Sequence, residues 1–401
     1  MAIIVQKYGG TSVETIEKMK DIARRVIERK KEGNDMVIVV SAMGKTTNRL
    51  IELTKSISEN PCKRELDMLL STGEQVSISL LSMVFKELGY DAISLTGPQA
   101  GIKTKGNHTK SRIEDINIGI IKSHLNEGKI VIVAGFQGVN ENGDITTLGR
   151  GGSDTTAVAL AAKLKCMCEI YTDVDGIYSV DPRLYADAKK LHSIDYEEMM
   201  EMSSLGAKVM ETRSVEIGHK FSVPIYVAQS NGRIEGTYIK EIDENMEQKT
   251  ITGLTASDNV LMVTINNVPY NPQNISLIFE RLAEQDINVD MISQTSPYDG
   301  YVNVSFTTSK DEGNSVDAVV TELKKEMMSI EVSKDSNISK ISVVGTGMRN
   351  HSGVAAKIFK IFAQNSIEFK QVTTSEISIS YTINNSEKQS AINILARELN
   401  L

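Results

Sequence analysis

A lysine and two glycines follow the first apolar run of the chain. Lys7 and Tyr8 precede Gly9 and Gly10, and a helical pattern begins near Thr15. A glycine turn between a strand and a helix N-terminus offers backbone N–H groups and positive potential to an anion. Lys7 adds a mobile full charge. We therefore predict that this turn binds phosphate oxygens.

A second glycine turn, residues 149–154, has the sequence GRGGSD and leads into a helical pattern over residues 155–165. It contains Arg150, whose planar guanidinium can bind both oxygens of a carboxylate, and it ends in Ser153 and Asp154. Two such turns in one domain predict one site for phosphates and another for an anionic substrate.

Two polar segments accompany these turns. The loop over residues 41–48 (SAMGKTTN) leads from a strand to a helix, and its alternative reading is an ordinary turn with an N-cap. Glu74 lies inside the apolar stretch 68–85, where it either faces solvent or lines a cleft. If it is buried, its carboxylate needs a cationic partner.

A loop over residues 173–183 (DVDGIYSVDPR) follows another extended run. Tyr178 could stack on a ring, and Arg183 could clamp a phosphate. Lys208 adds a further cation, although a single lysine is more often solvated surface.

Composition limits the function classes. The chain has 401 residues, a net charge of −8, five histidines and three cysteines. The negative charge argues against nucleic acid or an anionic membrane as the main partner. We expect no transmembrane segment, no signal peptide, no metal site built by the protein, and a reducing, cytoplasmic location.

The first 245 residues alternate apolar extended runs with helical patterns, including helices expected over residues 64–88 and 115–127. This alternation predicts a mostly parallel sheet covered by helices on both faces. Ligands of such sheets gather at the carboxyl ends of the strands. Lys7, Ser41, Gly97, Gly135 and Asp173 each follow an extended run, so we expect them at one edge.

The C-terminal part repeats itself at an offset of about 80 residues. Residues 261–263 align with 341–343, and residues 290–295 align with 370–375. The second copy ends one strand short, and an unassigned extended stretch, residues 250–255, precedes the first copy. We predict a first domain over residues 1–245. A second, over residues 258–337, is inserted within a third formed by residues 249–257 and 338–401. The alternative is that residues 250–255 are merely linker.

Six ordered motifs resemble the aspartate kinases: KYGGTSV from Lys7, SAMGKTTN from Ser41, STGE from Ser71, TLGRGGSDTTA from Thr147, TDVDGIYSVDPR from Thr172 and GAKVM from Gly206. The repeated C-terminal units resemble the paired ACT domains of that family. The resemblance covers nearly the whole chain. It implies an amino-acid-kinase αβα sandwich, carbamate-kinase-like, followed by two ferredoxin-like βαββαβ ACT domains.

The resemblance also implies ATP-dependent, Mg²⁺-assisted phosphorylation of the side-chain carboxylate of L-aspartate, with site residues as follows. Lys7 and Asp154 are the catalytic pair. Residues at the nucleotide are Lys7, Gly9, Gly10, Thr172, Asp173, Tyr178, Arg183, Lys208 and Val209. Residues at the substrate are Ser41, Thr47, Glu74, Arg150, Ser153 and Asp154. Glu74 would hold the substrate ammonium, and Arg150 its α-carboxylate.

The ACT-like units imply feedback inhibition by lysine, threonine or both, and a homodimer or dimer of dimers formed through these units. Candidate effector residues are Asp290, Gln294, Met348, Ser352 and Thr374; the alternative is a packing module without a ligand. The chain departs from the family after Lys208, where Glu211 places an acid that we expect near the nucleotide. Alternative functions are a glutamate or acetylglutamate kinase and a non-catalytic amino-acid sensor.

Overall fold

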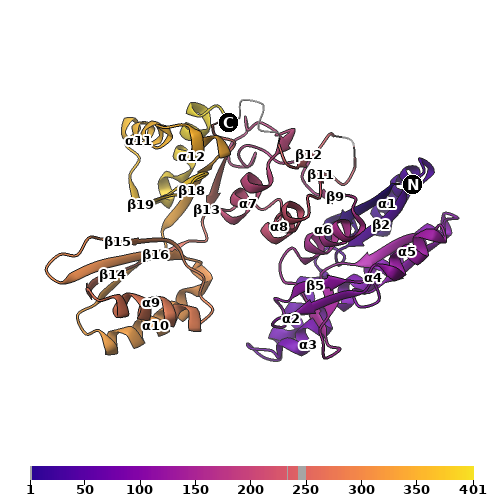
Figure 1. Ribbon diagram of the computed structural model, residues 1–401, viewed down its shortest axis with the longest axis horizontal. Helices are drawn as coiled ribbons and strands as arrows, with labels where there is room; N and C mark the ends of the chain where they lie inside the picture. Colours follow the sequence, from indigo (N-terminus) through magenta and orange to yellow (C-terminus); the bar gives the residue numbers. More distant parts are fainter. Residues whose placement is uncertain (1, 233, 243–249) are drawn as a thin grey trace. The chain divides into compact units, whose positions relative to one another are not determined.

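The structure is a computed structural model that describes residues 2–232, 234–242 and 250–401 (Figure 1). Its contacts divide the chain into two compact units. The first comprises Met1–Tyr178, Lys190–Ser204 and Lys208–Met246, and the second comprises Ser179–Lys189, Leu205–Ala207 and Glu247–Leu401. Most of the charged stretch at residues 240–249 lies outside the described residues.

The first unit is built on an eight-stranded sheet with the strand order β10-β12-β11-β9-β1-β2-β6-β3. Every neighbouring pair is parallel except β11 and β12. The strands are β1 (Ile3–Tyr8), β2 (Asp35–Val40), β3 (Ala92–Leu95), β6 (Ile130–Ala134), β9 (Met167–Thr172), β10 (Ser193–Ile194), β11 (Ile225–Gln229) and β12 (Thr237–Ile239). The predicted, mostly parallel sheet is therefore confirmed.

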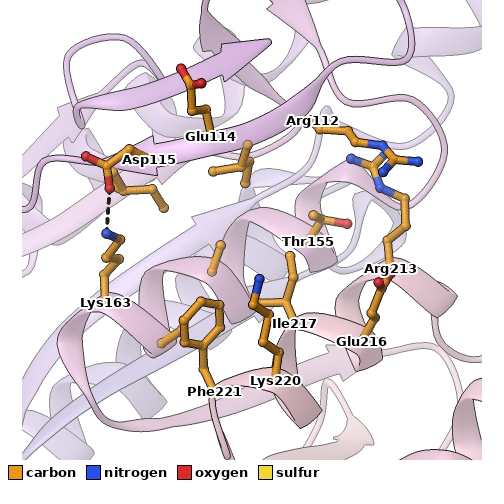
Figure 2. Close-up of a pocket in the computed structure, with 14 residues that line it drawn as sticks. Arg112, Glu114, Asp115, Thr155, Lys163, Arg213, Glu216, Ile217, Lys220 and Phe221 are labelled. Carbon is orange, nitrogen blue, oxygen red and sulfur yellow. Dashed lines mark hydrogen bonds and ion pairs between the residues drawn. The ribbon is translucent and has the colours of Figure 1, made fainter. Parts of the chain in front are cut away.

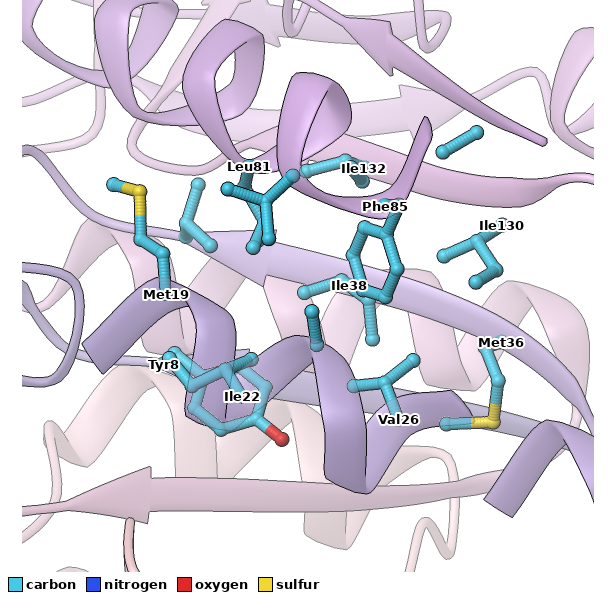
Figure 3. Close-up of a cluster of buried hydrophobic side chains, with 14 of the residues drawn as sticks. Tyr8, Met19, Ile22, Val26, Met36, Ile38, Leu81, Phe85, Ile130 and Ile132 are labelled. Atoms are coloured by element: carbon cyan, nitrogen blue, oxygen red, sulfur yellow. The ribbon is translucent and has the colours of Figure 1, made fainter. Parts of the chain in front are cut away.

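Helices α1 (Ile16–Lys31) and α4 (Thr72–Glu87) pack together on one face of this sheet. Their apolar side chains meet those of β1, β2, β3 and β6 in one core cluster (Figure 3). Ile22 from α1, Ile38 from β2 and Phe85 from α4 are all buried there. Burial of each such side chain stabilises the fold by about 1.5–3 kcal/mol, so this core holds the two helices against the sheet.

Helix α6 (Gly152–Leu164) contacts β1, β2 and β9 on one side and α8 (Thr212–Lys220) on the other. Eleven of its residues are buried. That position explains its run of small residues, because alanines let neighbouring elements approach closely. Helix α7 (Tyr196–Ser204) packs in turn on α8.

A smaller sheet with the order β5-β4-β7-β8 completes the first unit. Its strands are β4 (Ile102–Lys105), β5 (Arg112–Ile116), β7 (Gln137–Val139) and β8 (Ile145–Thr147). The helix expected over residues 115–127 was wrong in its first part, which is the end of β5; helix α5 begins later (Gly119–Asn126). Pairing with β4 overrode the local helical pattern.

The helix expected over residues 64–88 is divided at Ser71 into α3 (Lys63–Leu70) and α4. By length and composition this run could cross a membrane, but 56% of its most apolar window is buried inside the unit. Helix α4 also contributes to the core cluster, as a core helix of a globular domain does. Helix α2 (Thr46–Lys55) contacts α3.

The second unit contains two four-stranded antiparallel sheets. One has the order β15-β16-β14-β17, formed by β14 (Leu261–Pro269), β15 (Asp290–Gln294), β16 (Tyr301–Thr308) and β17 (Glu331–Asp335), with helices α9 (Pro272–Glu284) and α10 (Gly313–Glu326). The other has the order β13-β18-β20-β19, formed by β13 (Gly253–Ser257), β18 (Ile338–Val344), β19 (Phe369–Thr374) and β20 (Ser378–Asn384), with α11 (Val354–Gln364) and α12 (Lys388–Glu398).

Strand β13, which precedes the first repeat in the chain, pairs along its whole length with β18 of the second repeat. Leu254 of β13 is buried in that repeat's core. The two sheets adjoin at β15 and β19. There Gln371 donates a side-chain hydrogen bond to the Met291 carbonyl, a contact between positions 80 residues apart.

Candidate active site

Lys7 and Asp154 bring the two glycine turns together. Lys7 is the fifth residue of β1, and Asp154 lies in the first turn of α6. The Lys7 Nζ lies 2.6 Å from Asp154 Oδ1, and both side chains are almost wholly buried. A Cβ added to Gly9 would lie 3.6 Å from the same Nζ. The ammonium group is therefore held over the first turn by a residue of the second.

The first turn also packs closely on the loop after β2. The Gly44 N–H donates to the Gly10 carbonyl at 2.9 Å. A Cβ at Gly10 would lie 2.7 Å from the Ala42 carbonyl oxygen, so any side chain there would force the loops apart. Ser41, at the start of this loop, and Thr47, in the first turn of α2, are half-buried. The structure therefore assembles these segments at one edge of the sheet, as predicted.

Glu74 is buried near the N-terminus of α4. Its Oε1 accepts a hydrogen bond from the Ala42 N–H at 3.1 Å, whereas its buried Oε2 has no partner among the described residues. Among the described residues, no cationic side chain forms an ion pair with Glu74, so the cation that a buried carboxylate needs is not supplied by them. Burial raises the pKa of this carboxyl to about 7, and the backbone hydrogen bonds offset part of that rise. One carboxylate oxygen is therefore available to an incoming cation.

The second turn has a backbone suited to glycine. Gly149 and Gly151 have φ angles of 78° and 63°, in the region that side chains disfavour. A Cβ added to Gly135, just after β6, would lie 2.7 Å from Ser153 Oγ. The backbone at the end of β6 therefore packs closely against Ser153. Arg150, on the same glycine turn as Ser153, is exposed.

Glu211 lies against this second turn. A Cβ added to Gly151 would lie 2.4 Å from Glu211 Cβ. Burial raises the pKa of Glu211; the positive charges of Arg213 and Arg150 oppose that rise, and the Asp154 carboxylate adds to it. The structure packs Glu211 on the turn that carries Arg150, and its place near the nucleotide stays a prediction.

Sequence reasoning missed Asp67, which is fully buried in α3. Its carboxylate accepts hydrogen bonds from the Thr147 hydroxyl at 2.5 Å and from the Thr109 N–H at 3.0 and 3.1 Å, and it pairs with His108 Nδ1 at 2.8 Å. The Thr109 carbonyl in turn packs on Gly149. Asp67 thus anchors the approach to the second turn. Its signal in the sequence was an acid beside an apolar Met-Leu-Leu run.

Three of the residues predicted at the nucleotide, Thr172, Asp173 and Tyr178, lie at the end of β9 and in the loop after it. Thr172 Oγ1 donates to Asp173 Oδ1 at 3.1 Å, and the Tyr178 hydroxyl donates to Asp175 at 3.0 Å. The Ser230 hydroxyl donates a hydrogen bond to the Thr172 carbonyl. The same hydroxyl accepts a hydrogen bond from the hydroxyl of Ser12, beside the first glycine turn. The ends of β1, β9 and β11 are therefore linked by hydrogen bonds.

A cavity of about 540 Å³ lies at this linked edge. Its lining includes Thr11, Ser12, Lys18 and Asp173. Lys208 is exposed and Val209 is half-buried. Arg183 belongs to the second unit, where its guanidinium pairs with Asp181 at 2.7 Å.

The candidate effector residues fall on the second unit. Asp290 Oδ2 accepts from Lys340 Nζ at 2.6 Å across the adjoining sheets. Gln294 and Thr374, at the ends of β15 and β19, are exposed, as is Ser352. Met348 is partly buried against the core of the second repeat. Asp290 is thus already paired, while the neighbouring polar side chains are accessible.

Comparison with known proteins defines first the class and then the family. Residues 2–229 match the amino acid kinase family, and residues 341–399 match an ACT domain. The chain is 48% identical over 403 residues to the aspartokinase of Bacillus sp. strain MGA3, covering 100% of this chain and 98% of that protein. It is 47% identical to aspartokinase 2 of Bacillus subtilis over 98% of this chain and 97% of that one. The chain belongs to the aspartokinase family.

Solved structures agree with this assignment. E. coli aspartokinase III in complex with aspartate and ADP matches with a TM-score of 0.82 at 23% identity, covering 100% of both chains, which shows the shared fold. The aspartate kinase from Synechocystis matches with a TM-score of 0.55 at 39% identity, covering 100% of this chain and 69% of that one. The chain is therefore an aspartate kinase with an amino-acid-kinase domain and a C-terminal ACT domain.

Proposed function

We propose that the chain transfers the γ-phosphoryl group of ATP to the side-chain carboxylate of L-aspartate, giving 4-phospho-L-aspartate. The contact between Lys7 and Asp154 carries this proposal, because it joins the phosphate-binding turn to the substrate-binding turn. Two anionic reactants must meet here, and phosphoryl transfer depends mainly on their alignment and on neutralisation of their charge.

The acceptor needs no general base, since a free aspartate side chain has a pKa of about 3.9 and is already ionised at neutral pH. Lys7 would move its ammonium from Asp154 to the transferring phosphoryl group, over Gly9 and Gly10. Asp154 orients that ammonium before the substrates arrive. The reaction thus uses charge placement in place of proton transfer.

Three residues would bind aspartate, and two more would line its site. Arg150, exposed on the second turn, would hold the α-carboxylate, and Ser153 would donate to it. The unpartnered Oε2 of Glu74 would accept the substrate ammonium. Ser41 and Thr47 would line the same site from the loop after β2.

The nucleotide would lie along the ends of β1 and β9, with Thr172, Asp173 and Tyr178 beside it and Lys208 and Val209 completing its surroundings. Arg183 stays a proposed phosphate contact. The described residues contain no group of three or more acidic, histidine or cysteine side chains able to hold a metal. Mg²⁺ would be held largely through the substrate phosphates, as kinases generally hold it. When bound, the ion neutralises phosphate charge.

An aspartate-dependent ADP-release assay tests the reaction, with L-glutamate and N-acetylglutamate as competing acceptors. Arg150→Ala should raise the aspartate KM with little effect on kcat, because it removes a substrate contact. Arg397→Ala, at an exposed position on α12, is the matched control. An unchanged aspartate KM in Arg150→Ala, or equal turnover with glutamate, would contradict the substrate assignment.

Lys7→Ala should lower kcat about 100-fold or more, as expected for an electrostatic group that acts in the transition state. Because the substitution leaves Asp154 buried without its partner, circular dichroism must first show that the variant is folded at the assay temperature. A folded variant with near-normal kcat would end the assignment of Lys7 and exclude this mechanism.

We further propose that the repeats bind lysine, threonine or both as feedback inhibitors, which places the reaction at the start of lysine, threonine and methionine synthesis. Support comes from Asp290, Gln294 and Thr374, which lie on the adjoining strands β15 and β19. Met348 and Ser352 would contribute from the second repeat. Calorimetric titration of each amino acid tests this; absence of binding by either would remove the proposal.

The strand order supports the proposed domain division, in which residues 258–337 are inserted between residues 249–257 and 338–401, after a catalytic domain over residues 1–245. We also propose a cytoplasmic homodimer or dimer of dimers associated through the repeats. The described cysteines are all free, as a reducing compartment requires. Light scattering with and without the effector measures the subunit number.

A further inference from the structure

A second cavity, of about 370 Å³, lies in the first unit among β5, α6 and α8. Figure 2 shows its lining side chains converging from these three elements. None of the residues assigned above to aspartate or nucleotide lines it. Its volume falls in the range of small-molecule sites.

The walls of this cavity are largely apolar. Ile113 and Ile116 come from β5, Ala159 and Ala162 from α6, and Phe221 from the end of α8. Phe221 is 55% exposed, and Lys220 Nζ lies 5.6 Å from the centre of its ring, so part of the ring surface remains accessible to a ligand. A bound molecule therefore needs an apolar or aromatic body.

The charges around the cavity do not balance. Asp115 is paired with Lys163 at 2.5 Å, and Glu114 is paired with Lys105 at 3.6 Å. After these pairs are removed, three cationic side chains remain on the lining, opposed by one acid: Arg112, Arg213 and Lys220 against Glu216. The side chains of the lining itself therefore carry an excess of positive charge, although Glu211, which is not part of the lining, also acts on Arg213.

Two of these cations face each other. Figure 2 shows the Arg112 and Arg213 guanidinium groups side by side. Burial lowers the pKa of Arg213, and the Arg112 charge lowers it further. Arg213 donates to the carbonyls of Leu148 at 2.7 Å and Ser111 at 3.0 Å, both uncharged acceptors. The Glu211 and Glu216 carboxylates act on Arg213 in the opposite sense, but no described ion pair joins either guanidinium group to a carboxylate. Two adjacent guanidinium groups of this kind form a fork suited to an oxyanion.

We propose that this cavity is a binding site for a small organic oxyanion, whose charged group sits between Arg112 and Arg213 and whose apolar body lies against Phe221 and Ile217. Phosphate and carboxylate heads share the required chemistry. This site uses neither Lys7 nor Arg150, so the proposal does not depend on the reaction proposed above.

Occupancy of the site would act on the second glycine turn. Arg213 holds the Leu148 carbonyl, next to Gly149, and the hydroxyl of Thr155, also on the lining, donates to the Gly151 carbonyl at 3.2 Å. A ligand that draws Arg213 toward the cavity alters the support of the turn that carries Arg150. This second consequence rests on the proposed role of Arg150 in aspartate binding.

The chain contains no tryptophan, so Phe221→Trp creates a single fluorescent reporter at the cavity. Phenyl phosphate is the probe that carries both the oxyanion and the apolar ring. Inorganic phosphate carries the oxyanion alone, and benzyl alcohol carries the apolar ring alone. We expect a saturable change in emission with phenyl phosphate, at an apparent Kd at least about tenfold below that of either partial probe, since both halves contribute.

Adding Arg112→Gln to the reporter protein should weaken phenyl phosphate binding about tenfold or more, through loss of a charge-assisted contact. Tyr298→Trp, an exposed position on the second unit, is the control reporter and should show no saturable change. Binding that is unaffected by Arg112→Gln would overturn the proposal. So would emission that changes with protein concentration and not with probe, since that would mean a second copy covers the cavity.

The kinase assay then tests the coupling separately. With the Phe221→Trp protein, phenyl phosphate should change the aspartate KM at the concentrations that saturate the fluorescence, and Arg112→Gln should abolish that change. Binding without any change in the aspartate KM would refute the proposed effect of the ligand on aspartate binding, but the proposed binding site itself would stand. Lack of kinase activity would refute the proposed reaction without touching the fluorescence result.

Discussion

Glu74 shows how one side chain is prepared for a cation that is not part of the protein. Its Oε1 is fixed by the Ala42 N–H, and its buried Oε2 has no described partner. A buried carboxylate of this kind prefers its protonated form, and its pKa rises to about 7. The charged form needed by a substrate ammonium is therefore sensitive to pH near neutrality.

We predict that kcat/KM for aspartate falls as the pH drops below about 7, because protonation of Glu74 in the free enzyme removes the counter-ion of the ammonium. The measurement uses saturating ATP and excess Mg²⁺ at each pH. Glu74→Gln should raise the aspartate KM and abolish the fall of kcat/KM at acidic pH. Glu87→Gln, at an exposed position on the same helix, should keep that fall. If kcat/KM of Glu74→Gln fell with pH as in the wild type, the assignment of Glu74 to the substrate ammonium would be contradicted.

The same group makes stability depend on pH. Its folded pKa of about 7 exceeds the unfolded value of 4.5, so the folded state binds the proton more tightly. The contribution of Glu74 is fully present below pH 4.5, falls as the pH rises to 7, and is absent above it. At about 1.36 kcal/mol per pKa unit, the loss is about 3 kcal/mol.

Unfolding of the first unit, followed by urea titration at several pH values, checks this prediction. The difference in unfolding free energy between the wild type and Glu74→Gln should change across that pH range in the direction given, and Glu87→Gln should not reproduce it. A difference that stays constant with pH would show that Glu74 is not protonated on folding.

Among the elements, α3 and β8 determine the geometry of the second glycine turn. Asp67 of α3 accepts a hydrogen bond from the hydroxyl of Thr147, which is the last residue of β8. This contact crosses from a helix to the small sheet, so it fixes where the turn begins. The turn itself is short and glycine-rich and cannot fix its own position.

Thr147→Val should destabilise the first unit by about 1–3 kcal/mol, because it removes a hydrogen bond to a buried carboxylate without a change in volume. It should also raise the aspartate KM through movement of Arg150. Thermal unfolding and steady-state kinetics measure the two effects, with Thr321→Val on the exposed face of α10 as the control. Wild-type stability in Thr147→Val would remove the anchoring role of Asp67.

For the molecule as a whole, the two C-terminal repeats are not consecutive in the chain. Strand β13 precedes the first repeat but completes the sheet of the second, with Leu254 buried in its core. Stability of the second repeat therefore depends on residues that lie more than 80 positions earlier. Pairing between residues so far apart in the chain lowers the folding rate.

Leu254→Ala should destabilise the second unit by about 2–5 kcal/mol, the cost of a cavity in a packed core. The test is differential scanning calorimetry, in which the transition of the second unit should shift and that of the first should stay. Leu53→Ala, half-exposed on α2, provides the matched control. An equal effect of both variants would argue against a structural role for β13 in the repeat.

The sequence alone determined the parallel sheet, the two glycine turns and the repeat, because apolar runs, glycine spacing and a fixed offset are local or periodic patterns. It also singled out Lys7, Glu74, Arg150 and Asp154. Tertiary structure decided the pairing of Lys7 with Asp154, the unpartnered oxygen of Glu74, and the place of Glu211 on Gly151. It also decided the anchoring by Asp67 and the division of residues 115–127 into strand and helix. These depend on contacts between residues far apart in the chain, where hydrogen-bond partners and burial, and not local propensity, determine the outcome.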